Sequence, residues 1–402
     1  MSTETSAGTP VAHDAPPADA AVSTVLPLLR MLALVLVLLG QAWLLVRTTA
    51  VTRYAPLDGI LGSLELGWTL LWVATGYAVV RGLDLAAARS ESGAPVVLGH
   101  LARVGLAVLG CLVAVAAVAR LTDAGGTAPV RQTLEHVLTF TWNWALLEQP
   151  TLGRIDLVPL RYFSIEVQAL AVVVLAHVIF RPWPRVRFVL GLAGVVAAAA
   201  WRVDLVAGDQ VNRALLETWA RGDAVLWGAL AAWAVPWFAR RQPWSASLSS
   251  AAVLPLLVMP LAVSFVDDAG RLLSVLVPLA ACLAAVALAG DGHGRMTLER
   301  FGRRRVVTAL AERWWLLVAL WGPVALGVAD LGAGWPGLGR VLMALVVLGA
   351  LVVTVEQLLV PGLAFAGRFF EALVRPAGAT GEGSAQVGDE ERGTGGDPTA
   401  QA

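Results

Sequence analysis

Lysine is missing from this chain of 402 residues, in which all 29 cationic side chains are arginines. The absence excludes chemistry that needs a lysine amine, such as a Schiff base, and it excludes a lysine-bearing phosphate loop. Charge of either sign is scarce, because 14% of the residues are charged against ~25% in an ordinary soluble domain. The 29 acidic residues cancel the arginines, so no basic excess indicates a nucleic acid partner.

Cysteine and histidine are also rare. The two cysteines, Cys111 and Cys282, lie inside apolar runs, which is typical of small buried hydrophobic side chains and not of a disulfide or a metal pair. The five histidines are dispersed, without a ligand spacing such as HExxH. The sequence therefore predicts neither a bound metal nor a bound cofactor.

Apolar residues dominate instead, at 57% of the chain, with a mean hydropathy of +0.72. They gather into runs of about 18 residues or more, each long enough to cross a ~30 Å hydrocarbon layer as a helix. These runs predict an all-α fold, a polytopic membrane helix bundle in the cell membrane, with membrane lipid as its surroundings. Ten spans are expected, at residues 25–46, 62–80, 98–119, 158–180, 186–203, 221–238, 250–267, 270–290, 310–331 and 338–365.

Two polar tails flank the predicted membrane domain of residues 25–367. Residues 1–24 are small, polar and Pro-rich, and residues 368–402 become Gly-rich and acidic. Segments so poor in large apolar groups cannot bury enough surface to fold alone. We therefore expect disorder in the N-terminal tail and from about residue 376 onward.

The arginines and tryptophans predict how the spans are oriented. Loops and tails predicted to be cytoplasmic hold fifteen arginines, against nine in the outer loops, Arg202 among them. Because short cytoplasmic loops are enriched in arginine, both termini are predicted to be cytoplasmic. Several of the 16 tryptophans, such as Trp68 and Trp183, lie near predicted span ends, where they are expected to anchor the helices in the headgroup layer.

Ionisable side chains inside the spans are the candidate site residues, because a charge near the bilayer centre costs ~2.5–3.5 kcal/mol. Glu166 is the strongest signal, since an ionised carboxylate there must pair with an arginine or stay protonated in a cavity. Asp223 is either a first-turn acid on a helix dipole or part of a polar cluster with Arg221 and Glu166 near the outer face. Arg30 in span 1 either snorkels to the inner interface or belongs to a site.

The polar residues occur in short sequence motifs, and the order of these motifs along the chain can be compared with that of a known family. Span 1 carries Arg30 and, eleven residues later, Gln41, and span 4 opens with the sequence SIEVQ of residues 164–168. Spans 2, 6 and 9 contain LWVATGY, RGDAVLWGAL and VALWGPV. In these phrases the chain resembles the acyltransferase 3 family of integral-membrane acyltransferases. That family typically has ten spans and acylates hydroxyl groups of cell-envelope glycans or metabolites.

The resemblance implies a reaction and a set of binding residues. It implies acyl-CoA as the acyl donor and co-substrate, and a hydroxyl group of a glycan or metabolite as the acceptor. Arg30, which is permanently charged and can bind in a bidentate way, would hold the phosphate or carbonyl end of the donor. The other substrate-binding positions that the motifs imply are Tyr77, Arg103, Ser164, Gln168 and Arg221.

Two departures from the family pattern concern the general base. The family has a histidine in span 1 and another late in the chain, where this chain has Gln41 and Trp321. A glutamine can position a hydroxyl group but takes no proton from it, and general-base help is typically worth ~10²–10⁴-fold in rate. We therefore expect Glu166 or Asp223 to act as the catalytic base, with Gln41 positioning the acceptor.

Two other functions stay open at this point. A catalytically inactive relative would keep the helix bundle as a partner or regulator of membrane proteins in envelope-glycan assembly, an interpretation that the two lost histidines favour. A transporter is the third interpretation. Against it, the sequence has no inverted internal repeat with paired broken spans.

Overall fold

The computed structural model describes residue 23 and residues 25–46, 64–121, 128–150, 156–157, 159–263, 269–290 and 302–374. Every regular element within these ranges is a helix, which confirms the all-α fold class. The predicted N-terminal tail, apart from residue 23, lies outside the described residues, and so does the C-terminal tail beyond residue 374.

All ten predicted spans fall on helices. Seven helices contain a segment long and apolar enough to cross a bilayer: α1 (Val25–Val46), α3 (Leu64–Ala88), α4 (Ala94–Leu121), α7 (Leu160–Ile179), α8 (Pro184–Ala207), α15 (Arg305–Leu331) and α16 (Gly337–Val374). The other three predicted spans lie on helices with shorter described apolar stretches, α11 (Asp223–Ala239), α12 (Gln242–Val263) and α13 (Ala269–Gly290). The chain is therefore a multi-pass α-helical membrane protein.

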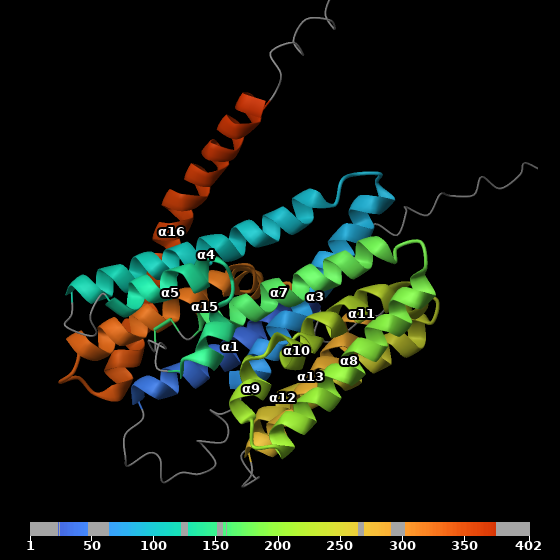
Figure 1. Ribbon diagram of the computed structural model, residues 1–402, viewed down its shortest axis with the longest axis horizontal. Coiled ribbons are helices and arrows are strands. Elements are labelled where there is room, and N and C mark those ends of the chain that lie inside the picture. The colour runs from blue at the N-terminus through green and yellow to red at the C-terminus, as the bar shows by residue number, and fades with distance from the viewer. Residues whose placement is uncertain are drawn as a thin grey trace, which may run out of the picture. The chain divides into compact units, whose positions relative to one another are not determined.

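The chain divides into two compact units, and the boundary between Val352 and Val353 falls inside α16. Within the first unit, α3 packs against α1, α11 and α13, while α15 packs against α1 and α4 (Figure 1). These two helices, α3 and α15, are the most deeply buried of the seven long apolar ones.

Glycine lets α3 and α11 cross at very close range. A Cβ atom on Gly76 would lie 2.0 Å from the carbonyl oxygen of Val225, and one on Gly228 would lie 2.1 Å from that of Val73. Larger side chains at the two glycines would therefore force the backbones apart. The glycines of LWVATGY and RGDAVLWGAL thus have a structural explanation, which is the contact between the two helices that carry these phrases.

Aromatic side chains fill the space between α3, α7 and α15. The rings of Trp68 and Tyr162 stack with centroids 4.1 Å apart, and Phe163 stacks on Trp314 at 6.1 Å. Trp68 is fully buried, so its predicted role as an interfacial anchor is wrong, whereas Trp183 is exposed as an anchor would be. A position near a span end does not show which way the ring points, and here α3 turns Trp68 inward.

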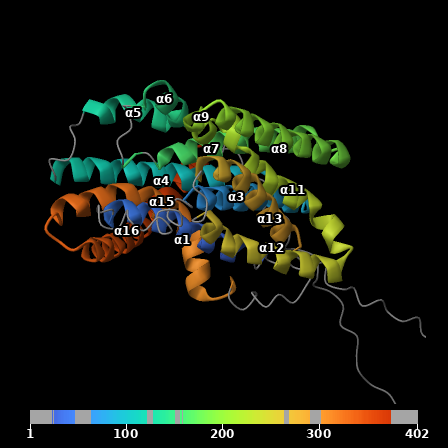
Figure 2. The ribbon, with the colours of Figure 1, turned by 90° about the horizontal axis from the view of Figure 1, so that it is seen from below.

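In the described connections lie four short helices: α5 (Ala128–Leu138), α6 (Trp142–Glu148), α9 (Val211–Leu216) and α10 (Thr218–Arg221). α6 packs against α7 and α9, and Figure 2 shows α6 and α9 beside each other. The side-chain amide of Asn143 on α6 donates hydrogen bonds to the carbonyl oxygen of Leu216 (3.0 Å) and to the hydroxyl of Thr218 (3.1 Å). This buried amide joins the connection before α7 to the connection before α11, although the two are distant in sequence.

Candidate active site

Glu166 lies on α7 and faces a histidine from another helix. Its side chain is fully buried, and its Oε1 atom is 3.1 Å from Nε2 of His100 on α4. The separation is that of an ion pair, although neither oxygen of Glu166 makes a well-aligned hydrogen bond within the described residues. A buried carboxylate needs such a partner, because removing an ionised group from water without compensation is very costly.

Arg30 connects this pair to two further charges. Arg30 on α1 interacts electrostatically with Glu166, with Arg103 on α4 and with Glu312 on α15. Its Nε atom is buried and has no hydrogen-bond partner within the described residues. Four helices thus bring five ionisable side chains together, and we call this group the Glu166 site: Arg30, His100, Arg103, Glu166 and Glu312.

The orientation of His100 determines what the Glu166 site can do chemically. Nε2 faces the carboxylate, so a proton on Nε2 points at Glu166 and leaves the lone pair on Nδ1. The His100 side chain keeps 14% of its surface exposed, and its Nδ1 makes no hydrogen bond within the described part of the chain. A neutral imidazole held in this way can accept a proton at Nδ1 while the carboxylate stabilises the resulting imidazolium.

Glu166, Arg30 and Arg103 were predicted as site residues from the sequence, whereas His100 was not. The available signals were a histidine inside an apolar run, three residues before Arg103, and a buried carboxylate without an obvious partner. Their meeting could not be read from spacing, because His100 and Glu166 lie on different helices.

Asp223 has a different partner from the one predicted. Its Oδ1 is 2.5 Å from Nη2 of Arg202 on α8, and Arg202 also donates from Nε to the carbonyl oxygen of Ala220 at 2.8 Å. Arg202 also interacts electrostatically with Arg221, so Asp223 and Arg221 lie around the same cation, and a shared cluster with Glu166 stays a prediction. Arg202, assigned by the charge count to an outer loop, lies inside α8 and is buried, and it engages the carboxylate that was a candidate base.

Arg221, the last residue of α10, contacts side chains of α3. Its guanidinium lies over the ring of Trp72 at 5.2 Å and donates from Nη2 to the hydroxyl of Thr69 at 3.3 Å. Both partners belong to α3. The cation–π contact and the hydrogen bond give this buried charge a structural role at the junction of α3 and α10.

Gln168 is engaged on all sides. Its amide nitrogen donates to the oxygens of Phe140 (2.5 Å) and Asn143 (3.1 Å), and its Oε1 accepts from Trp144 (3.0 Å) and from the hydroxyl of Thr218. These four contacts use the full hydrogen-bonding capacity of a glutamine. Gln168 therefore joins α6, α7 and α10 and has no group left for a substrate.

The remaining predicted residues are buried within the helix bundle. Ser164 donates to the carbonyl oxygen of Leu160 (3.4 Å) inside α7, and Tyr77 lies beside the glycine crossing of α3 and α11. Gln41 is buried, and the Oε1 atom has no hydrogen-bond partner within the described residues. Eleven residues of helix separate it from Arg30, about 16 Å along the axis, so Gln41 does not share the contacts of Arg30. Trp321, at the second lost histidine, is buried too.

Two apolar pockets in the described part of the chain are lined by other side chains. One lies between α7, α8 and α11, and the second lies between α1 and α12. Neither includes Arg30, Gln41, Glu166 or Arg221. The Glu166 site is therefore separate from both pockets, and two of its members, Arg103 and Glu312, are exposed.

Comparison with known proteins adds no relative. No family model, no curated protein and no solved structure matches this chain. The likeness to the acyltransferase 3 family rests on the motif residues alone, and any function must be argued from the Glu166 site.

Proposed function

We propose that this protein is a divergent membrane-bound acyltransferase in which His100, oriented by Glu166, replaces the histidine missing from span 1. The donor is acyl-CoA, and the acceptor is a hydroxyl group of a cell-envelope glycan or metabolite. The observation that carries the proposal is the 3.1 Å contact between His100 Nε2 and the buried Glu166 carboxylate. The proposal includes ten spans in the cell membrane, both termini in the cytoplasm, and membership of the acyltransferase 3 family.

The reaction uses the unoccupied nitrogen of His100. Nδ1 takes the proton of the acceptor hydroxyl as its oxygen attacks the thioester carbonyl, and Glu166 stabilises the imidazolium that forms. The tetrahedral intermediate collapses, the carbon–sulfur bond breaks, and the imidazolium returns the proton to the departing thiolate of CoA. The products are an ester and free CoA.

Arg30 supports this reaction through charge. Its guanidinium is permanently charged and buried beside Glu166, and its Nε atom has no hydrogen-bond partner among the described residues. Such a group can bind the donor's phosphate or stabilise the oxyanion of the intermediate. In this proposal Asp223 is not the base, because Arg202 binds its Oδ1 and favours the ionised carboxylate as a structural partner.

The test is acyl transfer from labelled acetyl-CoA to hydroxyl acceptors in membranes that contain the full chain. We expect His100→Asn to lower turnover by ~10²–10⁴-fold, the usual worth of general-base help. His136→Asn is the matched control, because His136 lies on α5 and contacts Thr141 instead of the Glu166 site. Unchanged turnover in His100→Asn, with correctly folded protein, would remove His100 as the base.

A second candidate function is that of an inactive relative that acts as partner or regulator in envelope-glycan assembly. The observation that favours it is that Gln41 and Trp321, at the two lost histidine positions, are both buried. Absence of transfer by the unmodified protein, together with co-purification of an intact acyltransferase from the native membrane, would support this candidate over the first.

A further inference from the structure

A second histidine cluster lies where α3, α7, α8 and α11 meet. His177 Nε2 is 3.7 Å from Oδ1 of Asp84, and His177 Nδ1 is 3.1 Å from Nη1 of Arg187 and 3.2 Å from Nε1 of Trp233. Arginine and tryptophan can only donate hydrogen bonds, so Nδ1 must accept, and the proton lies on Nε2 toward Asp84. His177 is therefore neutral. We call Asp84, His177, Arg187 and Trp233 the His177 cluster.

Positive charge is in excess at this cluster. Asp84 interacts electrostatically with three arginines, Arg187, Arg81 and Arg181, and Arg187 also interacts with Arg181. Three arginines therefore face one carboxylate, and the neutral His177 does not change the balance. An anion bound here would offset part of this excess.

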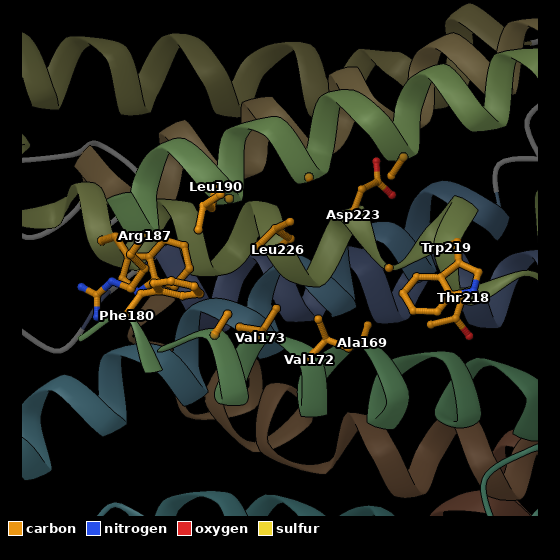
Figure 3. A pocket seen from close by; sticks show the side chains of 16 residues that line it. Ala169, Val172, Val173, Phe180, Arg187, Leu190, Thr218, Trp219, Asp223 and Leu226 are labelled. Atoms are coloured by element: carbon orange, nitrogen blue, oxygen red, sulfur yellow. The ribbon is translucent and has the colours of Figure 1, made fainter. Parts of the chain in front are cut away.

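Arg187 also forms one end of an apolar pocket of about 270 Å³ between α7, α8 and α11. Figure 3 shows Arg187 and Phe180 at one end, Thr218 and Asp223 at the other, and Leu190, Leu226 and Val173 between them. The Arg187 side chain is nine-tenths buried, yet its Nε has no hydrogen-bond partner within the described residues. A polar donor without a partner thus lies at one end of a channel that is apolar along its middle and has Thr218 and Asp223 at its other end.

The channel is open toward the surrounding lipid. Val172 and Leu190 line it and are about half exposed, as expected of side chains that face acyl chains. Small residues of α8 make the space, namely Gly191, Gly194 and Ala198. Its volume is below the ~300–1,000 Å³ typical of sites for drug-sized ligands, so it suits one hydrocarbon chain and not a nucleotide-bearing donor.

We propose that this channel binds an anionic phospholipid, with one acyl chain between α7 and α8 and the phosphate against Arg187. The arginines lie near the ends of α3 and α7 and the start of α8, on the face predicted to be cytoplasmic. Basic pockets between spans on that side attract anionic headgroups, because each arginine near the membrane surface adds about 1 kcal/mol of attraction. The lipid phosphate supplies the acceptor that Arg187 Nε lacks, and the acyl chain fills the apolar channel.

The charge half of the proposal is tested by lipid retention. Full-length protein is purified in detergent, incubated with phosphatidylglycerol or phosphatidylcholine, and examined by native mass spectrometry. We expect one phosphatidylglycerol to be retained in preference to phosphatidylcholine, and Arg187→Gln to weaken that retention about fivefold. Arg181→Gln, at an exposed position that leaves no buried gap, should weaken it in the same direction. Arg120→Gln, at an exposed arginine of α4, is the control.

The apolar half is tested by filling the channel. Ala198→Phe places a large ring in the channel and should lower retention of phosphatidylglycerol, whereas Ala197→Phe, at the exposed neighbouring position outside the lining, should not. Equal retention of both lipids by the unmodified protein, or equal effects of the two Phe variants, would overturn the proposal. Neither readout depends on acyl transfer, so the lipid site and the proposed enzyme activity can fail separately.

Discussion

Two histidine–carboxylate pairs lie in the described part of the chain, and the ring nitrogen that does not face the carboxylate makes their chemistry different. In the Glu166 site, the carboxylate faces His100 Nε2 at 3.1 Å, and Nδ1 makes no hydrogen bond within the described residues. In the His177 cluster, the carboxylate is 3.7 Å away, and two donors occupy Nδ1. The first histidine can therefore take a proton from a substrate, whereas the second holds four helices together and orients Arg187. A histidine beside a carboxylate is a candidate base only when its other nitrogen is accessible.

The largest expected difference between the two regions is in turnover. Glu166→Gln removes the charge that stabilises imidazolium at His100, so kcat should fall by ~10²-fold or more with KM little changed. Asp84→Asn makes the matching change in the His177 cluster and should leave acyl transfer nearly unaffected. Steady-state kinetics on both variants provide the measurement, and equal losses would show that the two pairs are not functionally distinct.

The next effect is on stability and compares a fully buried ion pair with one whose arginine is half exposed. Arg202→Met leaves Asp223 buried without its partner and should lower the free energy of unfolding by about 3–5 kcal/mol. Arg213→Met breaks the pair with Glu217, in which the arginine is 48% exposed, and should lower the free energy of unfolding by less than Arg202→Met does, because Glu217 keeps its hydrogen bond from Trp201. Denaturation of both variants in detergent gives the comparison. The double variant Arg202→Met/Asp223→Leu should recover much of the loss, and failure to do so would contradict this account.

The smallest effect is a difference in chemical reactivity between the two histidines. Diethyl pyrocarbonate modifies an accessible imidazole nitrogen, so His100 should react faster than His177, whose Nδ1 accepts two hydrogen bonds and whose ring is buried. Peptide mapping by mass spectrometry after brief labelling would measure both rates. Trp233→Phe removes one donor from Nδ1 and should raise the reactivity of His177 alone. Faster labelling of His177 than of His100 in the unmodified protein would reverse the assignment.

The helices could be predicted well from the sequence, because a hydrocarbon layer imposes a minimum length on any apolar run that crosses it. The first span was expected at residues 25–46, the bounds of α1, and the span expected at 270–290 differs from α13 by one residue. The predicted number of ten spans does not follow from the helices alone, because the described apolar stretches of α11, α12 and α13 are shorter than those of the other seven helices. Their crossing of the membrane stays a prediction.

The candidate site was predictable only in part. Glu166 and Arg30 stood out because charge inside an apolar run is costly, and Arg103 was implied by the family resemblance; in the structure, Arg30 interacts electrostatically with both Glu166 and Arg103. His100 and Arg202 did not stand out, although each provides the counter-charge of a buried carboxylate. Gln168 stood out as a binding residue, yet its hydrogen bonds show that it serves the connections between helices.

Composition and apolar run length were thus enough to establish a helical membrane protein and the positions of its helices, since both follow from the cost of placing backbone and charge in hydrocarbon. Which carboxylate meets which cation was decided by tertiary structure. That pairing depends on which helices are neighbours and how each is rotated about its axis, and close crossings such as Gly76 on Val225 set both. A partner on another helix leaves no spacing in the sequence by which it could be recognised.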